Sequence, residues 1–288
     1  FSTLKYFEDR PYWEKWFPTE LVLEMREQVR LWFYAMMFAS VTLEGRAPYK
    51  VVFSYEKVYD EKGKPMHKSA GNAIWFDEAV EKMGADVMRW LYCAFNPNNN
   101  LRFGYHVADE IRRRLITLWN VYGFLVTYAT LDGFDPATAE VEETLGKSPN
   151  PLDRWVLSDL YGTLEQMHRG LEEYDVASSL RVADEFLEAL STWYLRRSRR
   201  RFWKSASDED KSFAYRTLFH VLVTFSETLA PFVPFLTEEI YRNLTGSLRE
   251  KRRGVVVPRG EAAESDAAEP PDFEAWPESV HLRRWPRI

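Results

Sequence analysis

Residues 152–194 read LDRWVLSDLYGTLEQMHRGLEEYDVASSLRVADEFLEALSTWY. Apolar side chains recur along this segment at intervals of three or four residues, in two series. The first series is Leu152, Val156, Leu160, Leu164, Met167 and Leu171, and the second is Leu180, Ala183, Leu187, Leu190 and Tyr194. This spacing places each series on one face of an α-helix, so the segment predicts two amphipathic helices that need neighbours to cover their apolar faces.

The helical pattern extends on both sides, over residues 101–245. Residues 132–136 and 148–151 contain the Asp, Gly, Ser, Asn and Pro residues that favour turns, and Pro231 and Pro234 break a third long helix. Antiparallel helices with such short links form bundles. We therefore predict a mainly α protein whose bundle covers residues 101–245.

Residues 1–100 combine aromatic side chains with short β-like runs. Residues 49–54, YKVVFS, follow a proline and predict a short strand, whereas residues 24–43 have helix-forming composition and end before Gly45. Strand, helix and strand over residues 20–55 make one βαβ unit. One unit is far too little for a complete doubly wound domain.

The composition excludes several classes of protein. Of 288 residues, 45% are hydrophobic and 28% charged, which argues against a disordered or fibrous chain. The net charge of −6 argues against a uniformly basic nucleic-acid binder but allows a local basic site. A single cysteine, Cys93, excludes an internal disulfide framework and a zinc site built from several cysteines. No apolar run has membrane length and no basic-then-apolar leader is found, so we expect a soluble protein in a reducing compartment, with no membrane partner.

The C-terminal residues differ in composition from the predicted bundle. Residues 249–253 read REKRR, and residues 261–278 are rich in alanine, proline and acidic side chains. Such composition is typical of solvated connecting segments. We expect residues 246–288 to form a linker or tail that is basic and then acidic, and partly disordered.

A lysine-rich loop precedes a helix that we expect to begin near Phe76. Residues 62–72 read KGKPMHKSAGN. Cations, glycines and a hydroxyl in one loop allow close approach to phosphate oxygens, with backbone N–H groups as donors. A solvated turn without a ligand is the alternative that these residues leave open.

The order Met66-x-Lys68-Ser69-x-Gly71-Asn72, followed by Gly-Ala-Asp at residues 84–86, resembles the second nucleotide-binding motif of class I aminoacyl-tRNA synthetases. That family carries Lys-Met-Ser-Lys-Ser, and residues 64–69 hold the similar loop. The resemblance implies catalytic roles for Lys68 and Ser69, with Lys68 acting on ATP phosphates and the transition state. The ATP site that it implies comprises Lys64, Met66, His67, Lys68, Gly71 and Asn72. Pro65 stands where the family has its first lysine, and the loss of that cation should weaken transition-state stabilisation without abolishing it.

Residues 24–34 read EMREQVRLWFY. On a helix, Glu24, Glu27 and Gln28 would lie on adjacent faces and gather oxygens able to hold an ammonium group. An ordinary solvated face, with Trp32 and Phe33 packed inside, is the alternative. The segment resembles the isoleucyl and valyl branch of the same family, in which it lines the aminoacyl-adenylate site. The resemblance implies an adenylate and amino-acid pocket formed by Glu24, Glu27, Gln28 and Trp32.

An arginine run closes the second predicted helix: residues 193–204 read WYLRRSRRRFWK. If that helix continues, its apolar stripe through Leu190 and Tyr194 reaches Arg197 and Arg201. Arginines on such a stripe bind RNA by phosphate contact and stacking, or pair with internal carboxylates such as those of Asp184, Glu185 and Glu188. Simple solubility is a third interpretation.

The same run resembles the anticodon-binding helical domain of the isoleucyl branch, whose valyl counterparts lack the dense arginine series. The tRNA-binding residues that it implies are Trp193, Arg196, Arg197, Arg199, Arg200, Arg201 and Lys204. We nevertheless expect Trp119 and Trp193 to act mainly as core or hinge residues.

Together these resemblances imply a fragment of an isoleucyl enzyme. Residues 1–100 would be the C-terminal part of a Rossmann-type catalytic domain, residues 101–245 the anticodon-binding bundle, and residues 246–288 a linker or tail. The full-length enzyme would activate isoleucine with ATP, bring Mg²⁺ through the ATP, and transfer the acyl group to tRNA(Ile). We find no His-Ile-Gly-His-like segment and no editing domain, so we predict that the isolated chain is inactive, monomeric, cytoplasmic and free of zinc. The alternatives are a valyl enzyme fragment, a stand-alone tRNA-binding module without catalysis, and a structural bundle with internally paired arginines.

Overall fold

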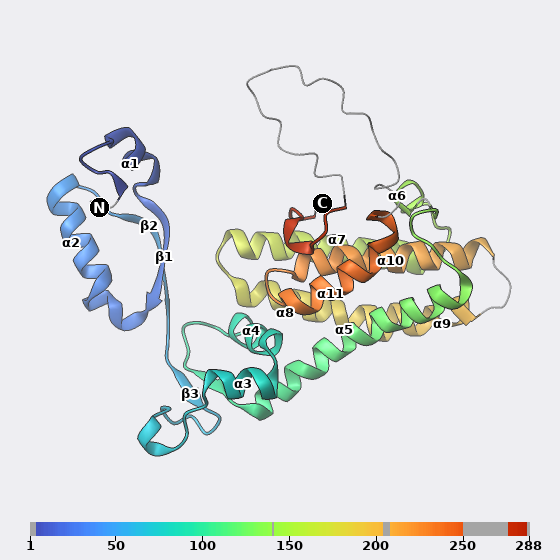
Figure 1. Cartoon of the computed structure of the whole chain (residues 1–288), viewed down its shortest axis with the longest axis horizontal. Coiled ribbons are helices and arrows are strands. Elements are labelled where there is room, and N and C mark those ends of the chain that lie inside the picture. Colours follow the sequence, from blue (N-terminus) through green and yellow to red (C-terminus); the bar gives the residue numbers. More distant parts are fainter. Residues whose placement is uncertain (1–3, 140, 204–207, 250–275, 287–288) are drawn as a thin grey trace. The chain divides into compact units, whose positions relative to one another are not determined.

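The computed structural model describes residues 4–139, 141–203, 208–249 and 276–286 (Figure 1). The chain forms two compact units. The N-terminal unit comprises residues up to 74 together with residues 95–104, and the helical unit comprises residues 75–94 together with the described residues from 105 onward. We describe each unit by itself.

The N-terminal unit contains the predicted βαβ arrangement. Strand β1 (Thr19–Met25) pairs in parallel with β2 (Tyr49–Tyr55), and helix α2 (Trp32–Glu44) connects them. A parallel pair needs such a crossover because the chain must return to the starting edge of the sheet. Helix α2 ends at Gly45, whose φ of +68° is the left-handed conformation that favours glycine at a helix C-terminus.

The predicted helix over residues 24–43 is wrong at its N-terminal end. Glu24 and Met25 are the last residues of β1, and residues 26–30 form a 3₁₀ helix, η2 (Arg26–Arg30), before α2 starts. The reason is the pairing with β2, in which Glu24 lies opposite Ser54 and Met25 opposite Tyr55. Backbone hydrogen bonds to a partner strand override the local helix preference of these residues.

The remaining elements of the N-terminal unit are short. Helix α1 (Arg10–Trp16) precedes β1, and a second parallel pair joins β3 (Val58–Asp60) to β4 (Leu101–Phe103). The 3₁₀ helix η3 (Lys68–Ala70) lies in the lysine-rich loop that follows β3. Residues 101–103 were expected to be helical, so the predicted helical region starts too early. They are a strand because Val58 and its neighbours offer a partner.

The helical unit is an all-helical assembly in the described residues, and the predicted bundle is confirmed. Its helices are α3 (Phe76–Met83), α4 (Ala85–Cys93), α5 (Tyr105–Asp132), α6 (Val141–Thr144), α7 (Pro151–Glu172), α8 (Val176–Glu188), the π-helix η4 (Ala189–Leu195), α9 (Arg196–Trp203), α10 (Glu209–Leu229), α11 (Pro234–Leu244) and the 3₁₀ helix η5 (Val280–Leu282). Helix α5 packs against α8 and α10, α7 packs against α8 and α10, and α11 packs against α10 (Figure 1). The break predicted at Pro231 and Pro234 separates α10 from α11.

The core of the helical unit follows the two apolar series. Val156, Leu160, Leu164 and Met167 of α7 are fully buried. The series through α8 and η4 is buried as well, at Leu180, Ala183, Leu187, Leu190 and Tyr194. Helix α10 packs against α5, α7, α9 and α11, and is therefore central to the core.

Helix α4 holds the turn between α10 and α11. The guanidinium of Arg89 donates to the carbonyl oxygens of Pro231 and Phe232, at 2.6 and 3.1 Å. The carboxylate of Asp86 accepts the backbone N–H groups of Phe235 and Leu236, at 3.3 and 2.7 Å. These N–H groups belong to the first turn of α11, where no carbonyl of the helix itself is available to them.

The C-terminal residues 276–286 pack on the bundle. Arg283 Nε lies 2.7 Å from Glu227 Oε1 of α10, and Ser279 Oγ and Val280 N both donate to Glu238 Oε2 of α11 at 2.9 Å. The expectation of a tail is therefore wrong for these residues, because ion pairs and hydrogen bonds hold them. The basic and acidic segments from residue 250 to 275 lie outside the described residues.

A buried histidine makes the helical unit sensitive to acid. Burial lowers the pKa of His220 in α10 to about 4, and its ring is hydrogen-bonded to the hydroxyl of Tyr161 at 2.9 Å. A histidine with a lowered folded pKa contributes stability that is present above its unfolded pKa of about 6.5 and is lost as the pH falls toward the folded value.

We therefore expect the His220→Gln variant to lose less stability on acidification than the original chain. Between pH 7 and pH 5 the original chain should lose about 2 kcal/mol more of its unfolding free energy than the variant, because the unfolded chain binds a proton at His220 that the folded core excludes. Urea unfolding at both pH values measures it. Equal pH slopes for the two proteins would contradict the neutral, buried state of His220.

Candidate functional site

The lysine-rich loop is closed by Asp60 and Asn72. One carboxylate oxygen of Asp60 accepts the backbone N–H groups of Lys62 and Lys64, at 3.0 and 2.8 Å. The Asn72 amide donates to the other Asp60 oxygen at 2.9 Å and to the Pro65 carbonyl at 3.0 Å. It also accepts the backbone N–H of His67 at 3.0 Å. The loop therefore has a defined shape that begins at the end of β3.

The electrostatics of the loop agree with this geometry. The hydrogen bond from Asn72, followed by that from the Lys64 N–H, lowers the pKa of Asp60 below its usual range. Sequence reasoning did not include Asp60. The signal that finds it is an aspartate followed three residues later by glycine, since aspartate side chains bond to backbone groups two residues on in turns.

The predicted ATP-binding residues lie together on this loop. The side chains of Lys64, His67, Lys68 and Ser69 are exposed, and Met66 and Asn72 are half-buried. Gly71 has a φ of +66°, and no atom lies within 4 Å of the position that a Cβ would occupy there. Cationic side chains beside an open backbone can approach phosphate oxygens without obstruction.

The predicted amino-acid pocket lies at the carboxyl ends of β1 and β2. Glu24 accepts from the hydroxyl of Tyr55 at 3.1 Å, and Glu27 forms an ion pair with Lys57 at 2.8 Å. The hydrogen bond from Lys57 lowers the pKa of Glu27. Gln28 accepts the backbone N–H of Trp32 at 3.1 Å. Ligands of open α/β sheets bind at this end of parallel strands.

The helical geometry expected for this pocket is wrong. Glu24 ends a strand, Glu27 and Gln28 belong to η2, and Trp32 opens α2. Trp32 is 44% exposed rather than packed inside, whereas Phe33 is buried as expected. The four candidates therefore lie along a strand end, the turn that follows it and the start of α2, and do not share one helix face.

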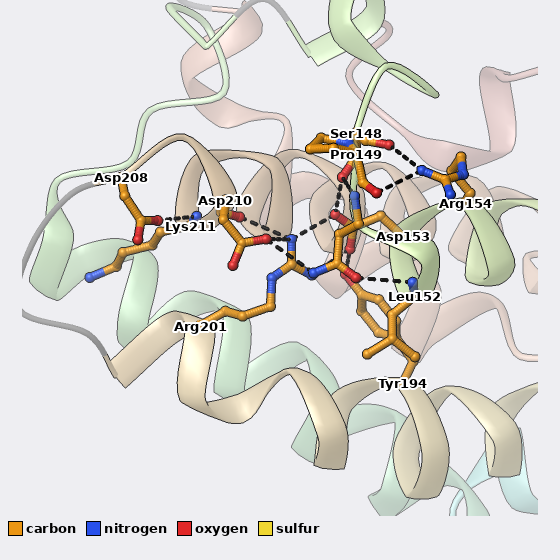
Figure 2. Close-up of polar contacts among 11 residues, drawn as sticks. Ser148, Pro149, Leu152, Asp153, Arg154, Tyr194, Arg201, Asp208, Asp210 and Lys211 are labelled. Carbon is orange, nitrogen blue, oxygen red and sulfur yellow. Dashed lines mark hydrogen bonds and ion pairs between the residues drawn. The ribbon is translucent and has the colours of Figure 1, made fainter.

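Arg201 is the member of the arginine run that turns inward. Its guanidinium lies against the carboxylate of Asp153 in α7 with distances of 2.6 and 2.7 Å, and against Asp210 of α10 at 2.8 Å (Figure 2). The Asp153 carboxylate also accepts from the hydroxyl of Tyr194 at 2.9 Å and from that of Ser148 at 2.6 Å. We name Ser148, Asp153, Tyr194, Arg201 and Asp210 the buried network.

The buried network corrects the prediction that Arg201 binds tRNA. Arg201 is only 6% exposed, so its charge is used inside the protein. Burial alone would lower the pKa of Arg201, but the Asp153 carboxylate raises it above its ordinary value and keeps the guanidinium charged. Burial and the Asp153 charge raise the pKa of Tyr194 well above the usual range, so the phenol stays a neutral donor.

The other described arginines of the run face solvent. Arg196, Arg197, Arg199 and Arg200 are exposed, and none makes an ion pair with a described residue. Lys204 lies outside the described residues. Of the acids proposed as internal partners, Asp184 pairs with Arg114 at 2.8 Å and Glu185 lies 3.9 Å from Arg181, while Glu188 makes no ion pair with a described residue. Internal pairing therefore holds for Arg201 and fails for these four.

The two tryptophans expected to be core or hinge residues are not in the core. Trp119 is 42% and Trp193 46% exposed. The guanidinium of Arg197 lies over the Trp193 ring, 3.7 Å from its centroid, and the Trp155 ring of α7 is 6.5 Å away at an angle of 63°. Trp155 was missed because its position on α7 places it beside η4 only after the helices pack.

Two features are absent from the described residues. No group of three or more His, Cys, Asp or Glu side chains is placed to hold a metal ion. In the same part of the chain, no helix combines the length and the apolar character needed to cross a bilayer.

Comparisons with known proteins agree with the two units. Residues 1–103 match the family model for class I tRNA synthetases (I, L, M and V), and residues 153–288 match that for the anticodon-binding domain of tRNA ligase. A crystal structure of the Agrobacterium radiobacter K84 agnB2 LeuRS in a ternary complex with tRNA and LeuAMS shares the fold. Its TM-score is 0.62 at 16% identity, over 80% of this chain and 27% of that one.

Curated relatives define the branch. The chain is 43% identical over 230 residues to the isoleucine–tRNA ligase of Dehalococcoides mccartyi strain CBDB1, covering 79% of this chain and 22% of the relative. It is 41% identical over 243 residues to the isoleucine–tRNA ligase of Bacillus thuringiensis strain Al Hakam, covering 84% and 23%. The chain thus spans less than a quarter of the length of these relatives. With both halves of the chain matched in this way, the chain belongs to the class I aminoacyl-tRNA synthetases and corresponds to one part of an enzyme of the isoleucyl branch.

Proposed function

We propose that this chain is the part of an isoleucine–tRNA ligase that carries the second nucleotide loop and grips tRNA(Ile). In the longer protein, isoleucine would be activated by ATP and then transferred to the tRNA. The observation that carries the proposal is the exposed arginine surface formed by Arg196, Arg197, Arg199 and Arg200, which have no carboxylate partner among the described residues. Guanidinium groups left without internal partners are suited to phosphate contacts.

The loop closed by Asp60 and Asn72 supports the nucleotide role. Lys64 and Lys68 extend from a loop whose shape is set by hydrogen bonds of the Asp60 and Asn72 side chains, so the backbone that carries the two lysines is in place before a ligand arrives. Charges fixed in advance stabilise a transition state better than charges that must reorganise. Mg²⁺ bound to ATP would neutralise part of the phosphate charge, while Lys68 would stabilise the charge that develops as the pyrophosphate leaves.

The carboxylates at the ends of β1 and β2 support an ammonium ligand. Glu24 and Glu27 bring two carboxylates to the edge at which ligands of parallel sheets bind. Both already have partners in Tyr55 and Lys57, so the amino group would compete with Lys57 for Glu27.

The test of the enzymatic proposal is pyrophosphate exchange. The longer gene product should exchange pyrophosphate into ATP when isoleucine is supplied, and the isolated 288-residue chain should not. Valine in place of isoleucine distinguishes the valyl alternative. Exchange by the isolated chain would show that it contains a complete catalytic site and would contradict the proposal of a partial one.

The isolated chain should bind tRNA with an affinity that falls as salt rises. Changing Arg196, Arg199 and Arg200 together to alanine should weaken binding at least about tenfold, because three phosphate contacts are lost. Each lost contact should also reduce the slope of log affinity against log salt by about 1. Filter binding or fluorescence anisotropy over a salt series measures both quantities.

The matched control for this variant is Arg181→Ala. Arg181 is exposed on α8, where its nearest acid is Glu185, and it is outside the arginine surface. Equal affinity and equal salt slope for the triple variant and the control would favour a structural bundle. Binding of tRNA together with a longer gene product that lacks exchange would favour a stand-alone tRNA-binding module.

A further inference from the structure

The arginine surface contains an aromatic contact as well as positive charges, at Arg197 and Trp193. Arg197 does not only present a cation, because its guanidinium lies 3.7 Å over the ring of Trp193. Trp193 is itself 46% exposed, and the half-buried Trp155 meets it edge-on from α7. A phosphate contact requires only the charge, so a guanidinium that lies over an exposed tryptophan ring calls for another explanation.

The backbone beneath this pair is unusual. Trp193 lies in η4, a π-helical turn inserted between α8 and α9. The extra residue in such a turn rotates the side chains that follow by about 100° relative to an uninterrupted α-helix. Within η4, Tyr194 and Leu195 both face the core while Trp193 remains exposed. π-Helical turns are uncommon and frequently occur at functional sites.

The buried network holds η4 and α9 on the side that faces the core. Arg201, one turn beyond Arg197, is held by Asp153 and Asp210, and Tyr194, next to Trp193, donates to Asp153. Asp153 lies on α7 two residues before Trp155. Trp155, Trp193 and Arg197 therefore lie on elements that the buried network joins, which reduces the entropy lost when a ligand binds them.

We propose that Trp193, Arg197 and Trp155 form a stacking site for an unpaired nucleobase of the RNA, which would lie on the outer face of the Arg197 guanidinium and extend the Arg197–Trp193 stack. This inference rests on the proposed function, since it assumes that the arginine surface binds RNA. It distinguishes two kinds of contact. Arg196, Arg199 and Arg200 would bind phosphate groups, whereas Arg197 would stack on the plane of a base. Arginine guanidinium planes and aromatic rings both stack on unpaired bases.

The Arg197→Lys variant tests the stacking directly. Lysine keeps the charge but loses the planar group that stacks. We expect about a 5- to 150-fold loss of affinity for a short RNA hairpin with an unpaired loop, which corresponds to the energy of one base stacked on a side chain. The salt slope should not change, and neither should the affinity for an RNA duplex with the same number of phosphates. Trp193→Leu should show the same selective loss.

Two controls accompany these variants. Arg181→Lys makes the same chemical change at an exposed position of α8, and Trp203→Leu removes a tryptophan that is 55% exposed at the end of α9. Both should bind the hairpin as the original chain does. Circular dichroism confirms folding, and if Trp193→Leu fails to fold, Arg197→Lys alone decides.

The outcomes separate this inference from the proposed function. An original chain that binds neither RNA overturns both. A chain that binds both RNAs, with Arg197→Lys weakened equally for hairpin and duplex, makes Arg197 a phosphate contact and overturns the stacking site while the proposed function stands. Hairpin binding by Arg197→Lys equal to that of Arg181→Lys overturns the stacking site as well.

Discussion

Replacing Arg201 with methionine is expected to reduce the free energy of unfolding of the helical unit by about 3 to 5 kcal/mol. The change removes the guanidinium but keeps a long side chain, so the Asp153 carboxylate loses both of its charged hydrogen bonds and stays buried. Tyr194 and Ser148 would still donate to it, but no positive charge would remain in the buried network. A buried charge without its partner costs more than the pair contributes.

Arg200→Met is the matched control, because Arg200 is adjacent in sequence and exposed. It should change the unfolding free energy by no more than about 0.5 kcal/mol, as is usual for surface positions. Urea unfolding followed by circular dichroism compares the two variants. Similar midpoints for Arg201→Met and Arg200→Met would mean that the buried network contributes little to stability.

In the longer gene product, Lys68→Ala is expected to slow isoleucine-dependent pyrophosphate exchange about 100- to 1,000-fold, mainly through kcat. Lys68, whose side chain is exposed, is the first residue of η3. It lies in the loop whose shape is held by the hydrogen bonds of Asp60 and Asn72. A charge that acts on the leaving pyrophosphate lowers the transition state more than the ground state, so KM for isoleucine should change little.

Lys62→Ala is the control for this prediction. Lys62 is exposed in the same loop, and the contact that ties it to the loop is made by its backbone N–H, which the substitution leaves in place. Its exchange rate should stay close to that of the original protein. A Lys68→Ala enzyme that is as active as Lys62→Ala would exclude Lys68 from the activation step.

The helical unit was largely predictable because its signal is local. The four fully buried residues of the first series, from Val156 to Met167, repeat at helical spacing, and the driving force for burial is roughly proportional to the apolar area on that face. The turn at Pro231 and Pro234 is equally local, since proline cannot continue a helix interior.

The last two residues of the strand that ends at Met25 were not predictable in this way. Its partner, β2, begins at Tyr49, so the hydrogen bonds that make residues 19–25 a strand come from a distant part of the chain. The candidate amino-acid site inherits this difficulty, because Glu24 ends a strand and Glu27 lies in the turn after it, so the two do not share a helix face.

By itself, the amino-acid sequence determined that an arginine-rich helix follows an amphipathic pair, and that a lysine-rich loop precedes the bundle, because composition and spacing are properties of neighbouring residues. Only the tertiary structure decided which arginine is internal. The partners of Arg201 come from α7 and α10, and Asp153 is 48 residues away along the chain. An ion pair depends on separation in space, and that separation is set when the helices pack.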